Sequence, residues 1–239
     1  VTIVTHGYNP SVAGAPAWMA SLRDDIATNA LGGAQNYGTI AVTGPAGSLV
    51  ATCSPWNVDL SAGTNGDILV VLDWSAVADH LTTHVSAQEV ALAVVDKIVT
   101  GQNGKRALAE LPIHLIGHSR GGGLVCELAR LFGERGVVVD HLTPLDPHPL
   151  TAGDAQPVLP PTPIIDTPAA IYRNVVFADV YYQTAASPVG QYLAGAYNRL
   201  WSTTLTGGYH NNTPPNDTYA DHRNILLMYQ GTVNPANPF

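Results

Sequence analysis

The chain has 239 residues, 46% of them hydrophobic, and carries a formal net charge of −8 with only two lysines, Lys97 and Lys105. This length suits one α/β domain around a single core. The acidic balance excludes a role in binding nucleic acid, whose phosphates require a basic surface, and offers no polybasic segment to anionic lipid. No run of about twenty apolar residues predicts a transmembrane helix.

Composition is the one feature of the sequence that bears on whether the protein is exported. The first residues, VTIVTHGYNP, lack a basic region and are not read as a signal peptide. Charged residues make up just 12% of the chain, whereas Gly, Pro, Ala, Thr and Asn are plentiful. We therefore expect a secreted, extracellular protein.

Strand and helix patterns alternate along the chain. Apolar, β-branched runs of the kind buried on both faces of a parallel sheet predict strands at 1–5, 37–43, 68–73, 112–117, 137–145 and 174–182. Helical periodicity of apolar residues predicts helices at 15–30, 85–99, 120–133 and 220–230. The alternation predicts an α/β fold with a mainly parallel central sheet flanked by helices.

Three segments interrupt this rhythm within a single domain spanning 1–239. Residues 44–67 are rich in Gly, Ser, Thr and Asn, and residues 146–170 are rich in proline, so both are expected to be irregular. Residues 183–220 are a candidate cap or wall of an acyl pocket, or equally a surface excursion packed by its own aromatic side chains. Cys126 is interpreted as a core thiol rather than as a disulfide partner of Cys53.

The sequence GHSRG at 117–121 stands between a predicted strand and a predicted helix. In this context G-x-S-x-G predicts a nucleophile elbow, in which Ser119 occupies a tight, strained turn and its small neighbours, Gly117 and Gly121, allow the turn to form. The N-terminus of the following helix favours negative charge that develops near the serine. Ser119 is therefore the candidate nucleophile, and His118 is part of the same turn.

A nucleophilic serine needs a base, and the base needs an acid that orients it. His222, in YADHRNILLMY, lies where a loop meets a late helix and is the preferred base, with His210 as the second candidate. Asp146 follows a predicted strand directly and is the preferred acid. Asp179, on the next strand, is the second candidate, and its alternative role is to support the site through hydrogen bonds.

A tetrahedral intermediate also requires an oxyanion hole, usually made of two backbone N–H groups. One is expected from Arg120, the residue after the nucleophile. The other is expected from Tyr8, because the first strand is followed by His6 and Gly7, and Gly7 lets the backbone turn toward the site. His6 is interpreted as a residue that packs under this loop rather than as a second base.

Taken in order, these segments resemble the pancreatic-lipase-like family of the α/β-hydrolase superfamily. The similarity rests on a strand with a His-Gly-aromatic loop, a strand ending in Asp-Trp, the serine elbow, a Leu-Asp-Pro acid turn and a His-containing helix entry: IVTHGYN, VVLDW, HLIGHSRGG, LTPLDPHP and ADHRNILLMY. The resemblance covers most of 1–230. It implies Ser119, Asp146 and His222 as a triad, the Tyr8 and Arg120 amides as oxyanion donors, and no cofactor.

The resemblance also implies a substrate class, although the chain departs from the family at several points. Arg120 stands where that family more often has leucine, and the family's many disulfide cysteines are absent. The expected activity is hydrolysis of lipid esters, with an ester or lipid as partner and transient contact with a lipid interface. The alternatives are a short-chain esterase, a polyester hydrolase, an acyltransferase with the same triad, and an inactive lipid- or glycan-binding protein.

No metal site is expected. His80 and His84 have helical spacing, but the H-E-x-x-H pattern is absent, so they are interpreted as a solvated helix start. Asp154 and Asp166, in the proline-rich segment, are interpreted as solvated loop carboxylates rather than calcium ligands.

Overall fold

The computed structural model describes residues 1–9, 14–31, 36–54, 67–79, 83–101, 106–151, 165–203, 207–211 and 219–236. Within these residues, eight strands form one sheet in the order β3-β2-β4-β1-β5-β6-β7-β8. The strands are β1 (Thr2–Thr5), β2 (Asn36–Thr43), β3 (Val50–Cys53), β4 (Ile68–Asp73), β5 (His114–His118), β6 (Val139–Leu145), β7 (Val175–Gln183) and β8 (Tyr197–Trp201).

The sheet is parallel except at one edge, where β3 pairs antiparallel with β2. β1 lies at its centre between β4 and β5, with Val4 in register with Val71 on one side and Ile116 on the other. All of the β4 residues from Ile68 to Leu72 are buried, and successive ones pack into different clusters on opposite faces. This two-sided burial explains the unbroken apolar run of the strand.

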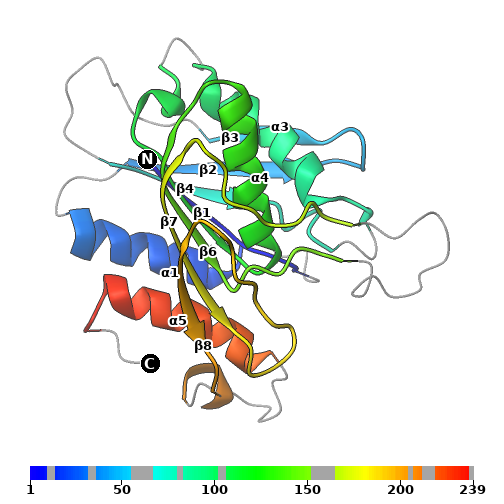
Figure 1. Cartoon of the computed structure of the whole chain (residues 1–239). Helices are drawn as coiled ribbons and strands as arrows, with labels where there is room; N and C mark the ends of the chain where they lie inside the picture. Colours follow the sequence, from blue (N-terminus) through cyan, green and yellow to red (C-terminus); the bar gives the residue numbers. More distant parts are fainter. Residues whose placement is uncertain are drawn as a thin grey trace.

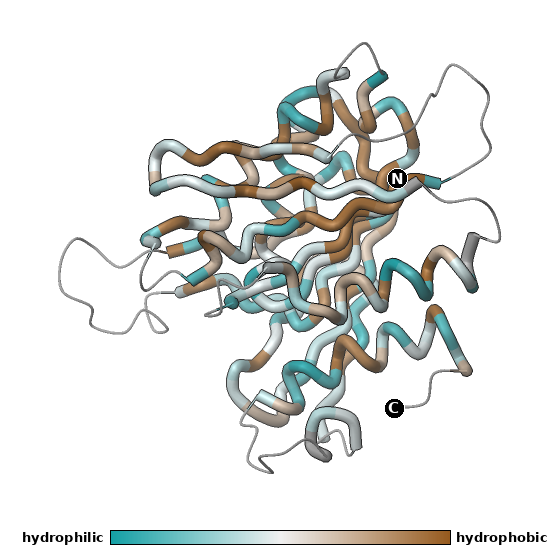
Figure 2. The backbone as a smooth tube through the Cα atoms, turned by 180° about the vertical axis from the view of Figure 1, so that it is seen from behind, coloured by the Kyte–Doolittle hydropathy of each residue, from teal (hydrophilic) through white to brown (hydrophobic). Residues whose placement is uncertain are grey.

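The α-helices cover both faces of the sheet (Figure 1). Helices α3 (Ala87–Val99) and α4 (Arg120–Glu134) pack together on one face, and α1 (Ala17–Asp25) and α5 (Ala220–Val233) lie side by side on the other. Hydrophobic stretches run along the central strands in Figure 2. The predicted α/β class, with a mainly parallel sheet between helices, is therefore confirmed.

Helix α3 follows the sequence pattern closely. Ser86 caps its N-terminus: the Ser86 side chain accepts from the Glu89 backbone N–H, and the Glu89 carboxylate accepts from the Ser86 N–H. This reciprocal capping box fixes where the helix begins. The predicted apolar stripe of Val90, Val94 and Ile98 is fully buried against the sheet.

Two strands lie in segments where the sequence pattern predicts none, the irregular segment 44–67 and the candidate cap 183–220. β3 falls within 44–67, and β8 falls within 183–220, where it pairs with β7 and so extends the sheet. The helix predicted at 15–30 is α-helical only as far as Asp25 and continues as a π-helical turn at Ile26–Leu31. Cys126 is a buried thiol that forms no disulfide, and burial raises its pKa to about 12.

Because the strands are parallel, their carboxyl ends lie at the same edge of the sheet. The residues that follow β1, β5 and β6 at this edge are the predicted oxyanion loop, the predicted elbow and the predicted acid. Among the helices of the described ranges, none combines the length and the apolar character that crossing a membrane requires.

Candidate active site

Ser119 occupies a strained turn between β5 and α4. Its φ of 59° and ψ of −127° lie in a region that non-glycine residues rarely adopt. A Cβ atom at Gly117 would lie 2.1 Å from the carbonyl oxygen of Gly121, and one at Gly121 would lie 2.3 Å from the carbonyl oxygen of His6. Both glycines of the motif are therefore needed for the turn to close.

The Ser119 backbone is fixed by its neighbours along the sheet edge. Its N–H donates to the Leu145 carbonyl oxygen at 2.9 Å, and its own carbonyl oxygen accepts from the N–H groups of Gly122 and His148 at 2.9 and 3.0 Å. Leu145 and His148 flank the predicted acid in sequence. The turn that carries Ser119 and the turn that carries Asp146 are thus bonded directly to each other.

Asp146 and His222 meet in a buried contact. Nδ1 of His222 lies 2.5 Å from Oδ2 of Asp146, and both side chains are almost fully buried. His222 enters from the first turn of α5, and Asp146 follows β6 with a positive φ of 44°. His118 packs its ring 4.6 Å from that of His222, and its Nε2 hydrogen-bonds the His222 carbonyl oxygen at 3.0 Å.

Gln183, which the sequence reasoning missed, completes the hydrogen bonding of Asp146. The Gln183 backbone N–H donates to Oδ1 of Asp146 at 2.8 Å, and its side-chain amide donates to Oδ2 at 3.1 Å. The same amide donates to the carbonyl oxygens of Ala186 and Pro188. A polar residue that ends the apolar strand beside the acid strand was the only sequence signal for this role.

Burial determines the protonation of this pair. Desolvation raises the pKa of Asp146, although the hydrogen bonds from Gln183 act to lower it. Desolvation lowers the pKa of His222. Desolvation likewise lowers the pKa of His118 to about 3. The imidazole of His222 is therefore neutral at neutral pH, as a proton acceptor must be.

The loop after β1 packs directly on the elbow. A Cβ at Gly7 would lie 2.7 Å from Cβ of Ser119 and 2.8 Å from the backbone nitrogen of Arg120. His6 is buried, and its ring stacks on Trp74 with centroids 5.5 Å apart. The Trp74 indole N–H donates to the His6 carbonyl oxygen at 2.8 Å, and the Trp74 backbone N–H donates to Nε2 of His6 at 3.3 Å. His6 is thus held against Trp74, and Gly7, the residue before Tyr8, packs against the elbow.

The second candidate acid, Asp179, contacts other residues. Asp179 hydrogen-bonds Nε2 of His141 at 2.8 Å and the Thr143 hydroxyl at 2.6 Å, in a polar cluster on the sheet under α5. The ring of His114 stacks on His141 at 3.9 Å in the same cluster. The backbone of His210 lies in a short 3-10 helix.

One expectation about the proline-rich segment is wrong. Asp166 is not a solvated loop carboxylate: its side chain is fully buried in an ion pair with Arg120, with 2.6 Å between Asp166 Oδ2 and Arg120 Nε. A lone aspartate in an irregular segment carries no periodic signal, so the sequence could not reveal this pairing. Asp154 and His80 lie outside the described residues, and His84 has a positive φ of 54° rather than a helical one. Over the described ranges, no group of three His, Cys, Asp or Glu side chains is arranged to hold a metal ion.

The family follows from the comparison with known proteins. The model of the alpha/beta hydrolase family matches residues 3–231. The chain therefore belongs to the α/β-hydrolase family. No curated protein sequence matches it.

Several solved structures are similar to this chain at low sequence identity. The product of gene lin2722 from Listeria innocua has a TM-score of 0.52 at 8% identity, covering 98% of this chain and 93% of that one. A protein assigned as a cell-surface hydrolase from Lactobacillus plantarum WCFS1 has a TM-score of 0.48 at 13% identity, covering 99% and 95%. The RedJ thioesterase of prodiginine biosynthesis from Streptomyces coelicolor has a TM-score of 0.43 at 11% identity, covering 96% and 89%. The Listeria innocua structure, with a TM-score above 0.5, shares the fold.

Proposed function

We propose that this α/β-hydrolase is a serine hydrolase of carboxylic esters, with Ser119 as nucleophile, His222 as general base and Asp146 as the acid that orients the base. The observation that carries the proposal is the 2.5 Å contact between Asp146 Oδ2 and His222 Nδ1, at the sheet edge where Ser119 stands in its strained turn. With Nδ1 donating to the carboxylate, Nε2 is the nitrogen whose lone pair accepts a proton.

The reaction proceeds in two acyl-transfer steps. Ser119 Oγ attacks the ester carbonyl carbon while Nε2 of His222 takes the hydroxyl proton, and Asp146 stabilises the imidazolium that forms. Collapse of the tetrahedral intermediate breaks the bond to the alcohol, which leaves with the proton from His222. Water then attacks the acyl-enzyme with His222 again as base, and the free acid leaves Ser119.

Backbone N–H groups of Tyr8 and Arg120 hold the oxyanion in both steps. The support for this assignment is the contact between the Gly7 loop and the elbow, where there is no room for a Cβ atom. Arg120 also opens α4, so the positive end of the helix macrodipole points at the same place. Fixed donors of this kind stabilise the charge that develops on the carbonyl oxygen.

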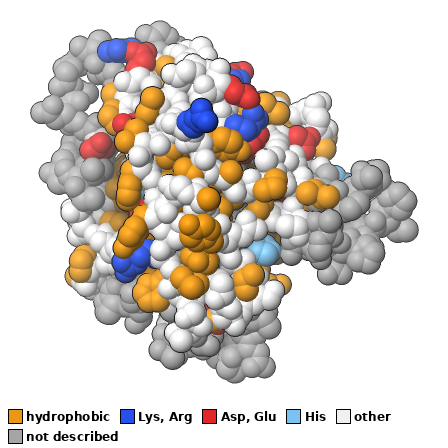
Figure 3. All heavy atoms as spheres, viewed as in Figure 1, with side chains coloured by type: hydrophobic (Ala, Val, Ile, Leu, Met, Phe, Trp, Pro, Cys, Tyr) orange, Lys and Arg blue, Asp and Glu red, His pale blue; other side chains and the backbone are white. Residues whose placement is uncertain are grey.

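Lipid esters are the proposed substrates, because the resemblance to pancreatic-lipase-like proteins is joined by apolar surface near the site. Tyr8, Tyr219 and Val189 are exposed. Tyr8 follows Gly7, and Tyr219 precedes the helix that carries His222. The Val189 carbonyl oxygen hydrogen-bonds His148, and the His148 ring lies 6.3 Å from the His222 ring. On the face shown in Figure 3, hydrophobic side chains are spread over the described surface, and most of the charged ones lie in its upper part.

The proposal is tested with p-nitrophenyl esters from acetate to palmitate, using the wild type and Ser119→Ala. Activity that peaks at long acyl chains and disappears in the variant supports a lipase. A peak at acetate or butyrate supports the same mechanism on short esters and contradicts the lipid assignment. Equal rates for wild type and variant contradict the role of Ser119.

We also propose that residues 1–239 act as one domain, since the described strands share a single sheet. Calorimetry should then record one cooperative unfolding transition. Two separate transitions would contradict this organisation.

A further inference from the structure

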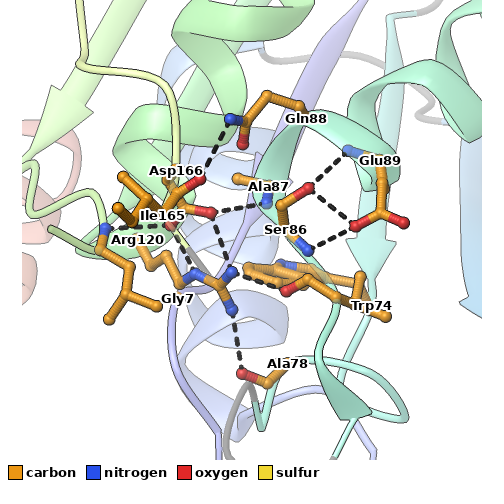
Figure 4. Close-up of polar contacts among 12 residues, drawn as sticks. Gly7, Trp74, Ala78, Ser86, Ala87, Gln88, Glu89, Arg120, Ile165 and Asp166 are labelled. Carbon is orange, nitrogen blue, oxygen red and sulfur yellow. Dashed lines mark hydrogen bonds and ion pairs between the residues drawn. The ribbon is translucent and has the colours of Figure 1, made fainter. Parts of the chain in front are cut away.

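The Arg120 side chain is almost fully buried, although it is charged. Its guanidinium makes a forked contact with Asp166, from Nε to Oδ2 at 2.6 Å and from Nη2 to Oδ1 at 2.9 Å. Nη2 also donates to the Val85 carbonyl oxygen at 2.7 Å, and Nη1 donates to that of Ala78 at 3.3 Å (Figure 4). Both edges of the planar guanidinium therefore face hydrogen-bond acceptors.

Asp166 is equally well satisfied. Besides Arg120, Oδ1 accepts from the Ala87 backbone N–H at 2.8 Å, and Oδ2 accepts from the Leu150 backbone N–H at 3.0 Å. Ala87 opens α3, and Leu150 lies shortly after the turn that carries Asp146. The ion pair therefore joins the elbow, the start of α3 and the segment beyond the acid turn.

The guanidinium also reaches the loop after β1 through Trp74. It lies over the Trp74 ring, 5.2 Å from the ring centroid. The N–H of the same indole donates a hydrogen bond to the His6 carbonyl oxygen. His6 is followed by Gly7, which touches the elbow. A continuous set of contacts thus runs from Asp166 through Arg120 and Trp74 to the peptide that joins His6 to Gly7, one residue before Tyr8.

We propose that the Arg120 side chain, held by Asp166, is a positioning unit for the oxyanion hole. This inference rests on the proposed function. Arg120 would supply one oxyanion N–H from its backbone while its side chain fixes that peptide and, through Trp74, the loop that supplies the other. A buried ion pair is a poor device for stability alone, since desolvation of both charges offsets their attraction. Fixing two hydrogen-bond donors in place is what such a rigid, fully bonded pair does well.

The experiment compares Arg120→Lys, which keeps the charge but cannot form the fork, with Asp166→Asn, which keeps the shape but loses the charge. The matched control is Arg135→Lys, because Arg135 follows α4 and pairs with the exposed Asp96 far from the elbow. Each protein is assayed for kcat and KM, for thermal unfolding, and for inhibition by an alkyl trifluoromethyl ketone, whose hemiketal with Ser119 carries an oxyanion.

Both site variants are expected to lose about ten- to a hundredfold in kcat with KM within about twofold, and to bind the ketone more weakly by a similar factor. The pH profile of kcat should keep its wild-type midpoint, because Asp146 and His222 are untouched. Arg135→Lys should match the wild type in every readout.

The proposal is overturned if the folded variants keep wild-type kcat and ketone affinity and lose only thermal stability. It is also overturned if neither variant folds, because the pair would then be a requirement of the fold. A wild type whose activity is unaffected by Ser119→Ala is a different result: it refutes the proposed function itself, and it is recognised before either ion-pair variant is measured.

Discussion

Gly7 is the position where one added methyl group gives the sharpest test of the oxyanion loop. In Gly7→Ala, the new Cβ would lie 2.7 Å from Cβ of Ser119, 2.8 Å from the Arg120 nitrogen and 2.9 Å from the His118 carbonyl oxygen. Carbon atoms in contact stand about 3.5–4.0 Å apart, so the loop must retreat by about 1 Å. The obstacles are backbone atoms and the nucleophile's own Cβ, which cannot swing aside.

A displacement of this size takes the Tyr8 N–H away from the oxyanion. Loss of one such donor costs about 10²–10³ in kcat, and overpacking costs about 1–3 kcal/mol of stability. We expect Gly7→Ala to remain folded with kcat reduced about a hundredfold and KM little changed. The assay is hydrolysis of the best p-nitrophenyl ester, with circular dichroism as the measure of folding.

The control is Gly123→Ala, in the helix that follows the elbow. Its new Cβ would lie 3.2 Å from Cβ and 3.7 Å from Cα of Pro149, inside a helix where alanine is favoured. This variant should keep near wild-type kcat. A Gly7→Ala protein with wild-type kcat would refute the placement of the oxyanion hole beside Gly7.

Three further outcomes are expected. Asp146→Asn should lower kcat by about 10⁴, because an amide no longer fixes the His222 tautomer; a loss below about tenfold, measured with the same ester, would contradict the role of the acid. The activity of the wild type should fall as pH drops through about 6, the raised pKa of Asp146, because a proton on the Asp146–His222 pair removes the base. Above that pH His222 stays neutral, since burial lowers its pKa. A kcat–pH profile that rises toward acid would contradict this prediction. Asp179→Ala should destabilise the fold by about 1–3 kcal/mol in urea unfolding, because His141 and Thr143 lose their hydrogen-bond partner. Its kcat per folded molecule should be retained. A loss of kcat as large as that of Asp146→Asn would instead make Asp179 the acid.

The sequence predicts the parts of the fold where local pattern and tertiary burial agree. β4 is apolar from Ile68 to Leu72 because both faces of the sheet are covered. Helix α3 carries its apolar stripe and its capping box within one short segment. β3 and β8 were not predicted because each lies toward an edge of the sheet with mostly exposed or half-exposed residues. Such strands form because a neighbour offers backbone hydrogen bonds, which no local pattern encodes.

The candidate site divides in the same way. Gly117, Ser119 and Gly121 could be predicted because one tight turn requires those residue types at that spacing. The partnership of Arg120 with Asp166 could not, because it joins positions that are distant in sequence and uses a residue from a segment without periodicity.

The central claim is that Ser119 is a nucleophile activated by the Asp146–His222 pair. Its most direct test is to label the protein with an active-site fluorophosphonate and locate the adduct by peptide mass spectrometry. The account predicts a single adduct on Ser119 that forms rapidly in the wild type, far more slowly in Asp146→Asn, and not at all in Ser119→Ala. An adduct on another residue, or equal labelling of the wild type and Ser119→Ala, would contradict it.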